Sequence, residues 1–357
     1  MFATKSAIRR IVLIKPCCIG DVIFATPLLT ALRRGFPDAA IDWAVGSSAI
    51  AALREHPDLS AVLDSGPLAN PASRPASLLK LARMLRAGRY DLAVVPDRSP
   101  LMGLAPLLAG IHVRAGLDSA GRGFTYTIKA PIDPDVVRHE ADIYLDIARR
   151  LGLNVENCWA NVPPSSGALA AARDALNAAG ATDRPFVVIH PGGGVNPGMV
   201  MVEKRWPAVN FAALAVRVAD RVGAQIVLVG AAQDREAVSA FRAAWTGLDR
   251  PLIDLTERLA LPEVGALASL ASLYVGNDNG VGHLAAASGA KVLMIFGPSD
   301  PSRYRPFVPE GRARVAWKAI HLPERGVSSG MPFQFDWERD GIGVEGACEQ
   351  AFSLLQS

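Results

Sequence analysis

Residues 186–194, FVVIHPGGG, decide the fold of this chain. The first five form an uninterrupted apolar run, rich in β-branched side chains, that ends at His190, and three glycines follow Pro191. A strand that is apolar throughout, rather than alternating, is typical of a parallel sheet covered on both faces. Beyond the glycines, Val209–Val222 has the apolar spacing of an amphipathic helix. The stretch therefore predicts a strand–loop–helix unit of an α/β fold.

The same unit recurs towards the carboxyl end of the chain. Further strands are predicted at Gln225–Gly230, Leu252–Asp254, Leu273–Gly276 and Lys291–Phe296, and helices at Asp234–Trp245, Pro262–Leu270 and Gly280–Ser288. This regular alternation indicates a doubly wound parallel sheet, in which ligands bind at the carboxyl ends of the strands.

The first half of the chain repeats the pattern. It opens with a short strand at Ile11–Lys15 and an amphipathic helix at Val22–Arg34. Strands at Ile41–Val45, Ala61–Leu63 and Leu92–Pro96 and helices at Ser47–Arg54, Ser77–Leu85 and Glu140–Leu151 continue it. We therefore predict two Rossmann-like doubly wound domains with a cleft between them.

A linker-like stretch, Val162–Gly167, separates the halves and leads into an Ala-rich helix that ends at Gly180. The predicted domains are residues 1–165 and 166–330. The tail, 331–357, is expected to hold a helix near Gly346–Leu355 that packs back on the first domain.

Composition limits the function classes. A net charge of +3 is too small to argue for nucleic-acid binding, although residues 1–165 carry 19 Lys and Arg against 15 Asp and Glu, which hints at an anionic partner. The longest apolar run, Leu101–Val113, is shorter than the roughly 20 residues of a membrane-spanning helix. No secretory signal is evident. We expect a cytoplasmic protein with four reduced cysteines.

The turn Asn277–His283 follows a predicted strand and opens a helix. A helix N-terminus presents unpaired N–H groups and a partial positive charge, which suit a pyrophosphate. Gly280 and Gly282 would allow close approach to the backbone. The alternative is an ordinary helix start capped by Asp278 or Asn279.

A second candidate phosphate site combines the glycines after His190 with Lys204 and Arg205. Glycines let a ligand lie against the backbone, and either cation would neutralise a diphosphate leaving group. The alternative is a surface loop with solvated cations. Trp206, next in the chain, is interpreted as a packing anchor.

Asp21 lies directly after Gly20 at a strand-to-helix turn. It is either a helix N-cap or a general base that projects into the cleft. The preceding Cys17 and Cys18 would make a poor metal site and are interpreted as small loop residues.

Two further patterns have a plain and a functional interpretation. Asp133-Pro134-Asp135 resembles the paired acids that hold a metal on nucleotide-sugars, but we favour a turn. Arg83, Arg86 and Arg89 mark either a solvated helix face or a contact with anionic lipid headgroups.

Taken together, these motifs resemble the bacterial heptosyltransferases of glycosyltransferase family 9, which have the two-domain GT-B fold. In the first half the resemblance is carried by Gly20-Asp21-Val22, Pro27-Leu28-Leu29, Phe36-Pro37-Asp38-Ala39, Tyr90-Asp91-Leu92, His139-Glu140 and Tyr144-Leu145. In the second half it is carried by His190-Pro191-Gly192, Lys204-Arg205-Trp206-Pro207, Gly276-Asn277-Asp278, Gly280, His283-Leu284-Ala285-Ala286 and Phe296–Pro301.

The resemblance implies a nucleotide-sugar donor, classically ADP-heptose, on the second domain. It implies, on the first domain, an acceptor from the lipopolysaccharide inner core at the cytoplasmic face of the inner membrane. Asp21 matches the family's catalytic base, Lys204 its phosphate-contacting lysine, and Asp234, more loosely, its acidic nucleotide-contacting position. The candidate donor-binding residues are Gly192, Gly193, Lys204, Asp234, Asp278, Asn279, Gly280 and His283.

The implied reaction is an inverting transfer without a metal ion or other cofactor. Asp21 would take the proton of the attacking hydroxyl, while Lys204 and backbone N–H groups stabilise the departing diphosphate. The chain departs from the family at Asn279, where Thr or Ser is usual, and at Cys17-Cys18, where residues such as Ser are common.

Three other functions stay open at this point. A GT-B-fold epimerase would act on the nucleotide-sugar alone. An NAD-dependent oxidoreductase is disfavoured, because no G-x-G-x-x-G turn follows the first strand. A non-enzymatic binding module leaves the base candidate and the phosphate sites unexplained.

Overall fold

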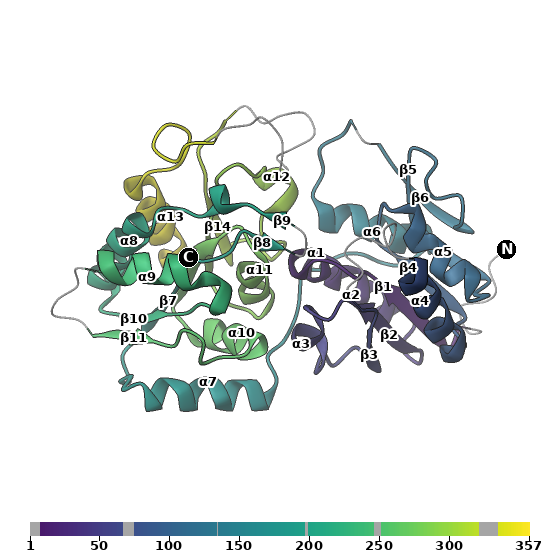
Figure 1. Ribbon diagram of the computed structural model, residues 1–357, viewed down its shortest axis with the longest axis horizontal. Coiled ribbons are helices and arrows are strands. Elements are labelled where there is room, and N and C mark those ends of the chain that lie inside the picture. Colours follow the sequence, from purple (N-terminus) through teal and green to yellow (C-terminus); the bar gives the residue numbers. More distant parts are fainter. Residues whose placement is uncertain (1–7, 67–74, 134, 197–198, 246–250, 321–334) are drawn as a thin grey trace. The chain divides into compact units, whose positions relative to one another are not determined.

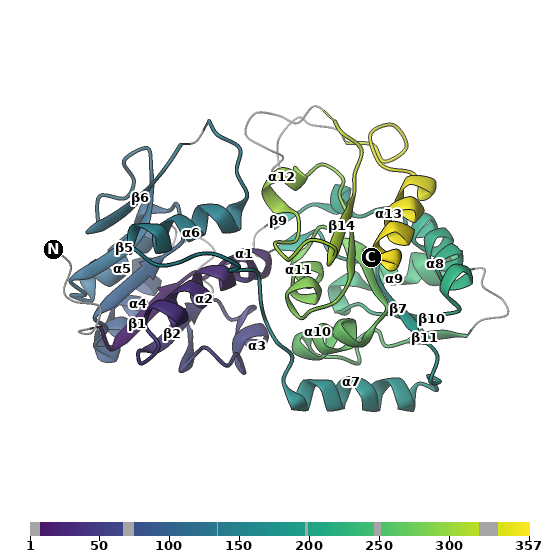
Figure 2. The same ribbon diagram turned by 180° about the vertical axis from the view of Figure 1, so that it is seen from behind.

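The computed structural model describes residues 8–357, apart from 67–74, 134, 197–198, 246–250 and 321–334. The chain forms two compact units, Met1–Ala160 and Asn161–Ser357. Each is built around one parallel sheet with helices on both faces (Figures 1 and 2). The predicted pair of doubly wound α/β domains is thereby confirmed.

The sheet of the first unit has the strand order β3-β2-β1-β4-β5-β6 in the described part of the chain. Ile11 of the central strand β1 pairs with Ile41 on one side and with Leu92 on the other, all in parallel register. The strands are β1 (Arg10–Ile14), β2 (Ala40–Val45), β3 (Ala61–Asp64), β4 (Leu92–Val95), β5 (Val113–Ser119) and β6 (Ile128–Ile132). Strands β1 and β4 have buried apolar centres, which is why the sequence predicts them, whereas β5 and β6, which contain Arg114, Asp118 and Lys129, are not among the predicted strands.

Helices cover both faces of this sheet. Helices α4 (Pro75–Gly88) and α5 (Pro100–Leu108) pack together in front of it in Figure 1, and α2 (Thr26–Gly35) packs with α6 (Glu140–Arg150) on the opposite face (Figure 2). Two shorter helices, α1 (Ile19–Phe24) and α3 (Ile50–Leu53), complete the set that the structure describes.

Two expectations for this unit need refinement. The predicted helix Val22–Arg34 is broken at Ala25 into α1 and α2, because Pro27 occupies the first turn of α2, where its missing N–H is tolerated. The apolar run Leu101–Val113 supplies α5 and the start of β5.

The sheet of the second unit has the order β11-β10-β7-β12-β13-β14. Its strands are β7 (Phe186–His190), β10 (Gln225–Leu228), β11 (Leu252–Asp254), β12 (Leu273–Asn277), β13 (Val292–Ile295) and β14 (Ala313–Ala316). The deciding strand β7 lies inside the sheet between β10 and β12. A two-stranded hairpin, β8 (Val195–Asn196) with β9 (Met199–Val200), and a 3₁₀ turn, η3 (Val202–Lys204), follow the glycine loop.

Two clusters of buried apolar side chains lie between this sheet and its helices, one on each face. One face is covered by α8 (Ala208–Val222), α9 (Arg235–Ala244) and α13 (Val344–Gln356). The other is covered by α7 (Ser166–Ala178), α10 (Leu261–Leu270) and α11 (Gly280–Ala287). A 3₁₀ turn, η4 (Ala232–Asp234), precedes α9, and α12 (Pro301–Tyr304) follows β13.

The expected place of the tail helix is wrong. Helix α13 belongs to the second unit, where it packs on α8 and β14. Its apolar face supplies the reason, because Ala347, Cys348, Ala351 and Leu354 are buried in the core beside the fully buried Phe211. Helix α13 therefore completes the layer of helices on one face of the second unit's sheet.

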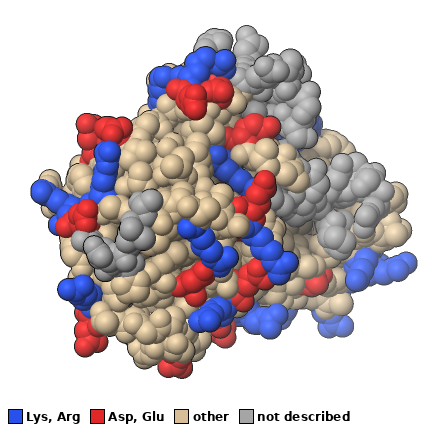
Figure 3. Space-filling view, turned by 60° about the vertical axis from the view of Figure 1, so that its left-hand side comes forward, with Lys and Arg blue, Asp and Glu red and all other residues tan. Residues whose placement is uncertain are grey.

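Surface properties agree with the modest net charge. Basic and acidic side chains are interspersed on the face drawn in Figure 3. Among the described helices none combines the length and the apolar character that crossing a membrane requires.

Candidate active site

The predicted donor-site residues of the second unit form one connected cluster. They lie where the neighbouring strands β10, β7 and β12 end, which is the ligand-binding edge of a doubly wound sheet. The loop after β7 supplies Gly192 and Gly193, the turn after β12 supplies Asp278, and η4 supplies Asp234. Hydrogen bonds between backbone and side chains join these loops to one another.

Asn277, at the end of β12, ties three segments together. Its side-chain amide donates to the carbonyl oxygens of Pro191 and Gly192, both at 2.9 Å, and its Oδ1 accepts the N–H of Trp206 at 2.9 Å. The residue is fully buried. Trp206 is itself buried and donates its indole N–H to the carbonyl of Ile342, so its predicted role as a packing anchor is confirmed.

Asn279 is the N-cap of α11. Its Oδ1 accepts the N–H of Gly282 at 2.9 Å, and its Nδ2 donates to the carbonyl of Gly192 at 3.2 Å. The side chain is thus committed to the turn itself. The first two helical residues, Gly280 and Val281, have no acceptor within the helix for their N–H groups, because none precedes them. Those N–H groups lie at the positive end of α11, a position that suits an anion.

Lys204 and His283 converge on the carboxylate of Asp278. The Nζ of Lys204 lies 2.6 Å from Oδ2, and Nε2 of His283 lies 3.4 Å from Oδ1. Burial would raise the pKa of Asp278, but the charge of Lys204 and the contacts of both partners outweigh it and hold that pKa well below its ordinary value. Lys204 keeps about a fifth of its side chain exposed (22%), whereas Asp278 is buried, so the ammonium is the accessible member of the pair.

Asp234 organises the glycine loop. Its carboxylate lies 3.3 Å from Nε2 of His190 and accepts the N–H groups of Gly193 at 2.9 Å and Ala231 at 3.0 Å. Burial would raise its pKa, but these donors lower it from 3.8 to about 2. His190 is held from its other nitrogen by the hydroxyl of Tyr274 at 3.0 Å. The structure therefore places Asp234 behind the loop, with its oxygens already occupied.

The glycines of this loop are needed for two different reasons. Gly193 has a φ of +112° and Gly194 a φ of +74°, both in the left-handed region. A Cβ on Gly192 would overlap the carboxylate of Asp234, and one on Gly193 would overlap the side chain of Asn279. Arg205 secures the loop by donating to the carbonyl of Gly193 at 2.9 Å.

In the first unit, Asp21 is the third residue of α1 rather than its N-cap, which is Cys18. The hydroxyl of Tyr144, on α6, lies 3.3 Å from Oδ1 of Asp21, and the N–H of Cys18 lies 3.4 Å from Oδ2. A buried ammonium, that of Lys15 at the end of β1, is bound to Asp97 at 3.1 Å and lies 5.4 Å from the ring centre of Tyr144. Asp21 is thus not the N-cap residue itself, but as the third residue of α1 it completes a capping box by accepting the N–H of Cys18.

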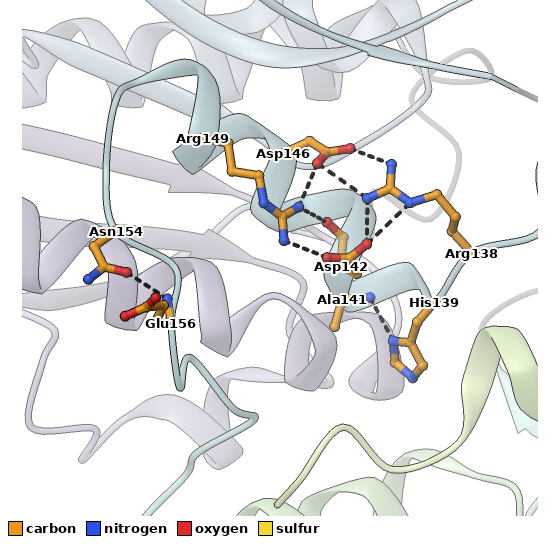
Figure 4. Close-up of polar contacts among 8 residues, drawn as sticks. All are labelled: Arg138, His139, Ala141, Asp142, Asp146, Arg149, Asn154 and Glu156. Carbon is orange, nitrogen blue, oxygen red and sulfur yellow. Dashed lines mark hydrogen bonds and ion pairs between the residues drawn. The ribbon is translucent and has the colours of Figure 1, made fainter.

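Charged side chains hold helix α6, which carries Tyr144. Arg138 and Arg149 face the carboxylates of Asp142 and Asp146 and form a closed network of ion pairs (Figure 4). Arg138 donates to Asp146 at 2.7 Å. Arg149 donates to both Asp142 and Asp146 at 2.6 Å, so the network runs along about three turns of the chain. At the start of α6, Nδ1 of His139 accepts the N–H of Ala141 and caps the helix. Both carboxylates are occupied by guanidinium groups.

The structure also decides two smaller questions. Cys17 and Cys18, in the turn after β1, are joined by a disulfide. The expectation of four reduced cysteines is therefore wrong for this pair, whereas Cys158 and Cys348 are free thiols. The N–H of Asp135 donates to Oδ1 of Asp133 at 3.0 Å, as in an Asx turn. This bond supports the interpretation of Asp133–Asp135 as a turn, although Pro134 itself lies outside the described residues. In the described part of the chain no three His, Cys, Asp or Glu side chains are grouped as metal ligands.

Sequence reasoning missed several residues of both clusters. Lys15, Asp97 and Tyr144 had no assigned role, although each follows a strand end or sits in a helix that was predicted. Asn277 was treated as part of a phosphate turn, whereas it clamps the loops from behind. A polar residue at the end of an apolar strand, as at Lys15 and His190, is the signal that was available.

Comparisons with known proteins agree with this architecture. The lipopolysaccharide heptosyltransferase 2 of Escherichia coli K12 is 27% identical over 325 residues, which cover 89% of this chain and 91% of the relative. The structure of E. coli ADP-heptose lps heptosyltransferase II superposes with a TM-score of 0.74 at 25% identity, covering 97% of this chain and 98% of the other. A family 9 glycosyl transferase from Veillonella parvula has the same fold, with a TM-score of 0.79 at 22% identity and coverage of 98% and 97%.

The predicted GT-B type of fold is confirmed by these neighbours. The model of glycosyltransferase family 9 (heptosyltransferase) matches residues 78–329, which is more than half of the chain. The chain therefore belongs to glycosyltransferase family 9 and is a glycosyltransferase.

Proposed function

We propose that this enzyme transfers a heptose, or a related sugar, from an ADP-activated donor to a lipopolysaccharide core acceptor, with inversion at the anomeric carbon and without a metal ion. The observation that carries the proposal is the cluster at the start of α11, where an accessible ammonium, Lys204, stands beside a helix N-terminus. Such a site binds an anion such as a diphosphate. The names of the relatives supply the sugar and the acceptor.

The chemistry divides between the two clusters. Asp21 takes the proton from the acceptor hydroxyl as that oxygen forms a bond to the anomeric carbon. The bond from the anomeric carbon to the diphosphate breaks, and its electron pair leaves with the phosphate oxygen. Lys204 and the N–H groups of Gly280 and Val281 stabilise this charge. Asp278, whose other oxygen contacts His283, holds the ammonium in place, and Asp234 shapes the glycine loop through Gly193.

A direct assay tests the proposal. Purified enzyme is incubated with ADP-heptose and with lipopolysaccharide from a heptose-deficient strain, and the saccharide product is identified by mass spectrometry and its anomeric configuration by NMR. Transfer with inversion is the expected result. Conversion of the donor to an isomeric nucleotide-sugar without acceptor would instead support an epimerase.

We place the enzyme at the cytoplasmic surface of the inner membrane, and the exposed face of α4 supports this. Residues 65–90 contain five Lys and Arg and no Asp or Glu. On α4 the side chains of Lys80, Arg83 and Arg86 are exposed beside Leu79, and α5 exposes Leu107 and Leu108. A basic helix face with apolar neighbours binds anionic headgroups.

Vesicle sedimentation tests this location. The enzyme should pellet with vesicles that contain phosphatidylglycerol but not with pure phosphatidylcholine, and salt should release it. Replacing Lys80 and Arg83 by Glu should abolish pelleting, whereas replacing the exposed Arg173 of α7 should not. Equal pelleting of both variants would show that α4 is not the contact.

A further inference from the structure

The buried ammonium of Lys15 has no part in the reaction as described above, and its surroundings set it apart from an ordinary surface ion pair. The residue directly follows strand β1 and is 7% exposed. Its Nζ lies 3.1 Å from Oδ2 of Asp97, which follows β4, and its charge lies 5.4 Å from the ring centre of Tyr144. The other oxygen of Asp97 accepts the N–H of Ser99 at 2.8 Å, which fixes the carboxylate.

Tyr144 connects this ion pair to Asp21. Its side chain is buried, with 1% of the residue exposed, and its hydroxyl is placed to donate to Oδ1 of Asp21 at 3.3 Å. Burial and the charge of Asp21 raise the pKa of this phenol well above its ordinary value, so it stays protonated and acts as a donor. Burial alone would lower the pKa of Lys15, but Tyr144, Asp21 and Asp97 raise it, so the ammonium stays charged.

We propose that Lys15, Asp97 and Tyr144 are positioning residues: Tyr144 orients the carboxylate of Asp21, and the buried Lys15–Asp97 ion pair sets the charge around it. The inference rests on the proposed role of Asp21 as the base. Tyr144 contacts one oxygen and the N–H of Cys18 the other, so one lone pair on each oxygen is left for the acceptor hydroxyl.

The charge balance of the group explains why both members of the ion pair are needed. Asp97 neutralises Lys15, so that Asp21 contributes the net negative charge of the group, and a proton taken up by Asp21 brings the group to neutrality. Removing Asp97 would leave the buried ammonium of Lys15 without its ion-pair partner, whereas removing Lys15 would leave the carboxylate of Asp97 without its own. The two changes therefore alter the charge near Tyr144 and Asp21 in opposite directions.

The other charged or titratable groups around Asp21 do not disturb this balance. Arg98 and Glu140 form their own ion pair at 2.7 Å. Tyr126 faces Asp97, and burial raises the pKa of its phenol, so it stays neutral. His139, which precedes α6, uses Nδ1 to cap that helix.

The test is the pH dependence of kcat for sugar transfer from ADP-heptose to heptose-deficient lipopolysaccharide. The acidic limb of this profile is the pH range in which kcat falls as the pH is lowered. In Asp97→Asn this limb should move to lower pH by about one unit, and in Lys15→Met it should move to higher pH by about one unit. Opposite shifts are the signature of a charge effect, because damage to the fold would lower activity at all pH values without moving the limb in two directions.

Tyr144→Phe removes only the hydroxyl. Turnover should fall about tenfold, with the KM for the donor unchanged, because the carboxylate loses its orienting donor. Tyr90→Phe is the matched control, since its buried hydroxyl bonds Asp42 at 2.7 Å in the same unit; it should leave kcat and the pH profile unchanged.

Calorimetry with ADP, which reports on the second unit, and a thermal melt show whether each variant is folded. If Lys15→Met does not fold, Asp97→Asn decides alone: an acidic limb that stays in place overturns the inference. Loss of activity in Asp21→Asn combined with unmoved limbs in the other variants would reject only this inference. Near-normal activity of Asp21→Asn would reject the proposed base itself.

Discussion

The Nζ of Lys204 lies 2.6 Å from the buried carboxylate of Asp278, although the two residues are 74 positions apart in the chain. The pair brings η3 against the turn that starts α11. Because Asp278 is buried and Lys204 is partly exposed, a bound diphosphate can share the ammonium without displacing the carboxylate. This arrangement makes Lys204 the first residue to test.

We predict that Lys204→Ala weakens both the binding of ADP and turnover. The loss of a charge-assisted contact corresponds to about 1.5–3 kcal/mol, divided between ground state and transition state because the leaving-group charge grows during the reaction. Calorimetry with ADP and steady-state kinetics of the same protein measure the two parts. Lys204→Arg should restore them incompletely, since a planar guanidinium does not reproduce a point charge.

The matched control for Lys204 is Arg173→Ala, which removes an exposed cation from α7 in the same unit. It should change neither quantity. If Lys204→Ala behaves like this control, Lys204 does not contact the donor.

Asp21→Asn should lower kcat by about 10²-fold or more while the affinity for ADP is retained, because the amide cannot accept the proton. The isosteric amide keeps the oxygen that Tyr144 contacts and gives up only the longer contact of 3.4 Å with the N–H of Cys18. Turnover within a few-fold of the unaltered enzyme would make Asp21 a structural residue of α1.

Treatment with EDTA should leave transfer activity unchanged, because the proposed leaving-group stabilisation uses Lys204 and backbone N–H groups. Activity before and after chelation, followed by addition of Mg²⁺ or Mn²⁺, measures this. A loss that either ion restores would contradict the metal-free mechanism and return attention to Asp133 and Asp135.

Stability in acid should depend on Asp234. Its folded pKa of about 2 lies below the ordinary 3.8, so its contribution is complete above about pH 4 and is lost as the pH falls towards 2. That shift corresponds to about 2 kcal/mol. Urea unfolding of Asp234→Asn should therefore show a flatter decline in unfolding free energy over this range. Asp183→Asn, which alters an exposed carboxylate, should follow the unaltered protein.

The sequence by itself determined that each half of the chain is a parallel α/β sheet and where its central strands lie, but it did not predict β5, β6, β14 or α5. The strand Phe186–His190 is apolar up to its last residue, and such a continuous run is typical of a strand whose two faces are both buried. The places where those strands end were equally legible, so Gly193, Asp278 and Asn279 were predicted before their contacts were known. Helix boundaries were less certain where local signals compete, as at Ala25, where Pro27 starts a new helix.

Only the tertiary structure decided which side chains meet. Lys15 and Asp97 are 82 positions apart and Tyr144 and Asp21 are 123 apart, and no local pattern links them. The tertiary structure also turned Asn279 inwards as a helix cap and seated α13 on the second unit. Such contacts arise when separate strands and helices pack, because hydrogen bonds and ion pairs depend on distances in space that a one-dimensional pattern does not contain.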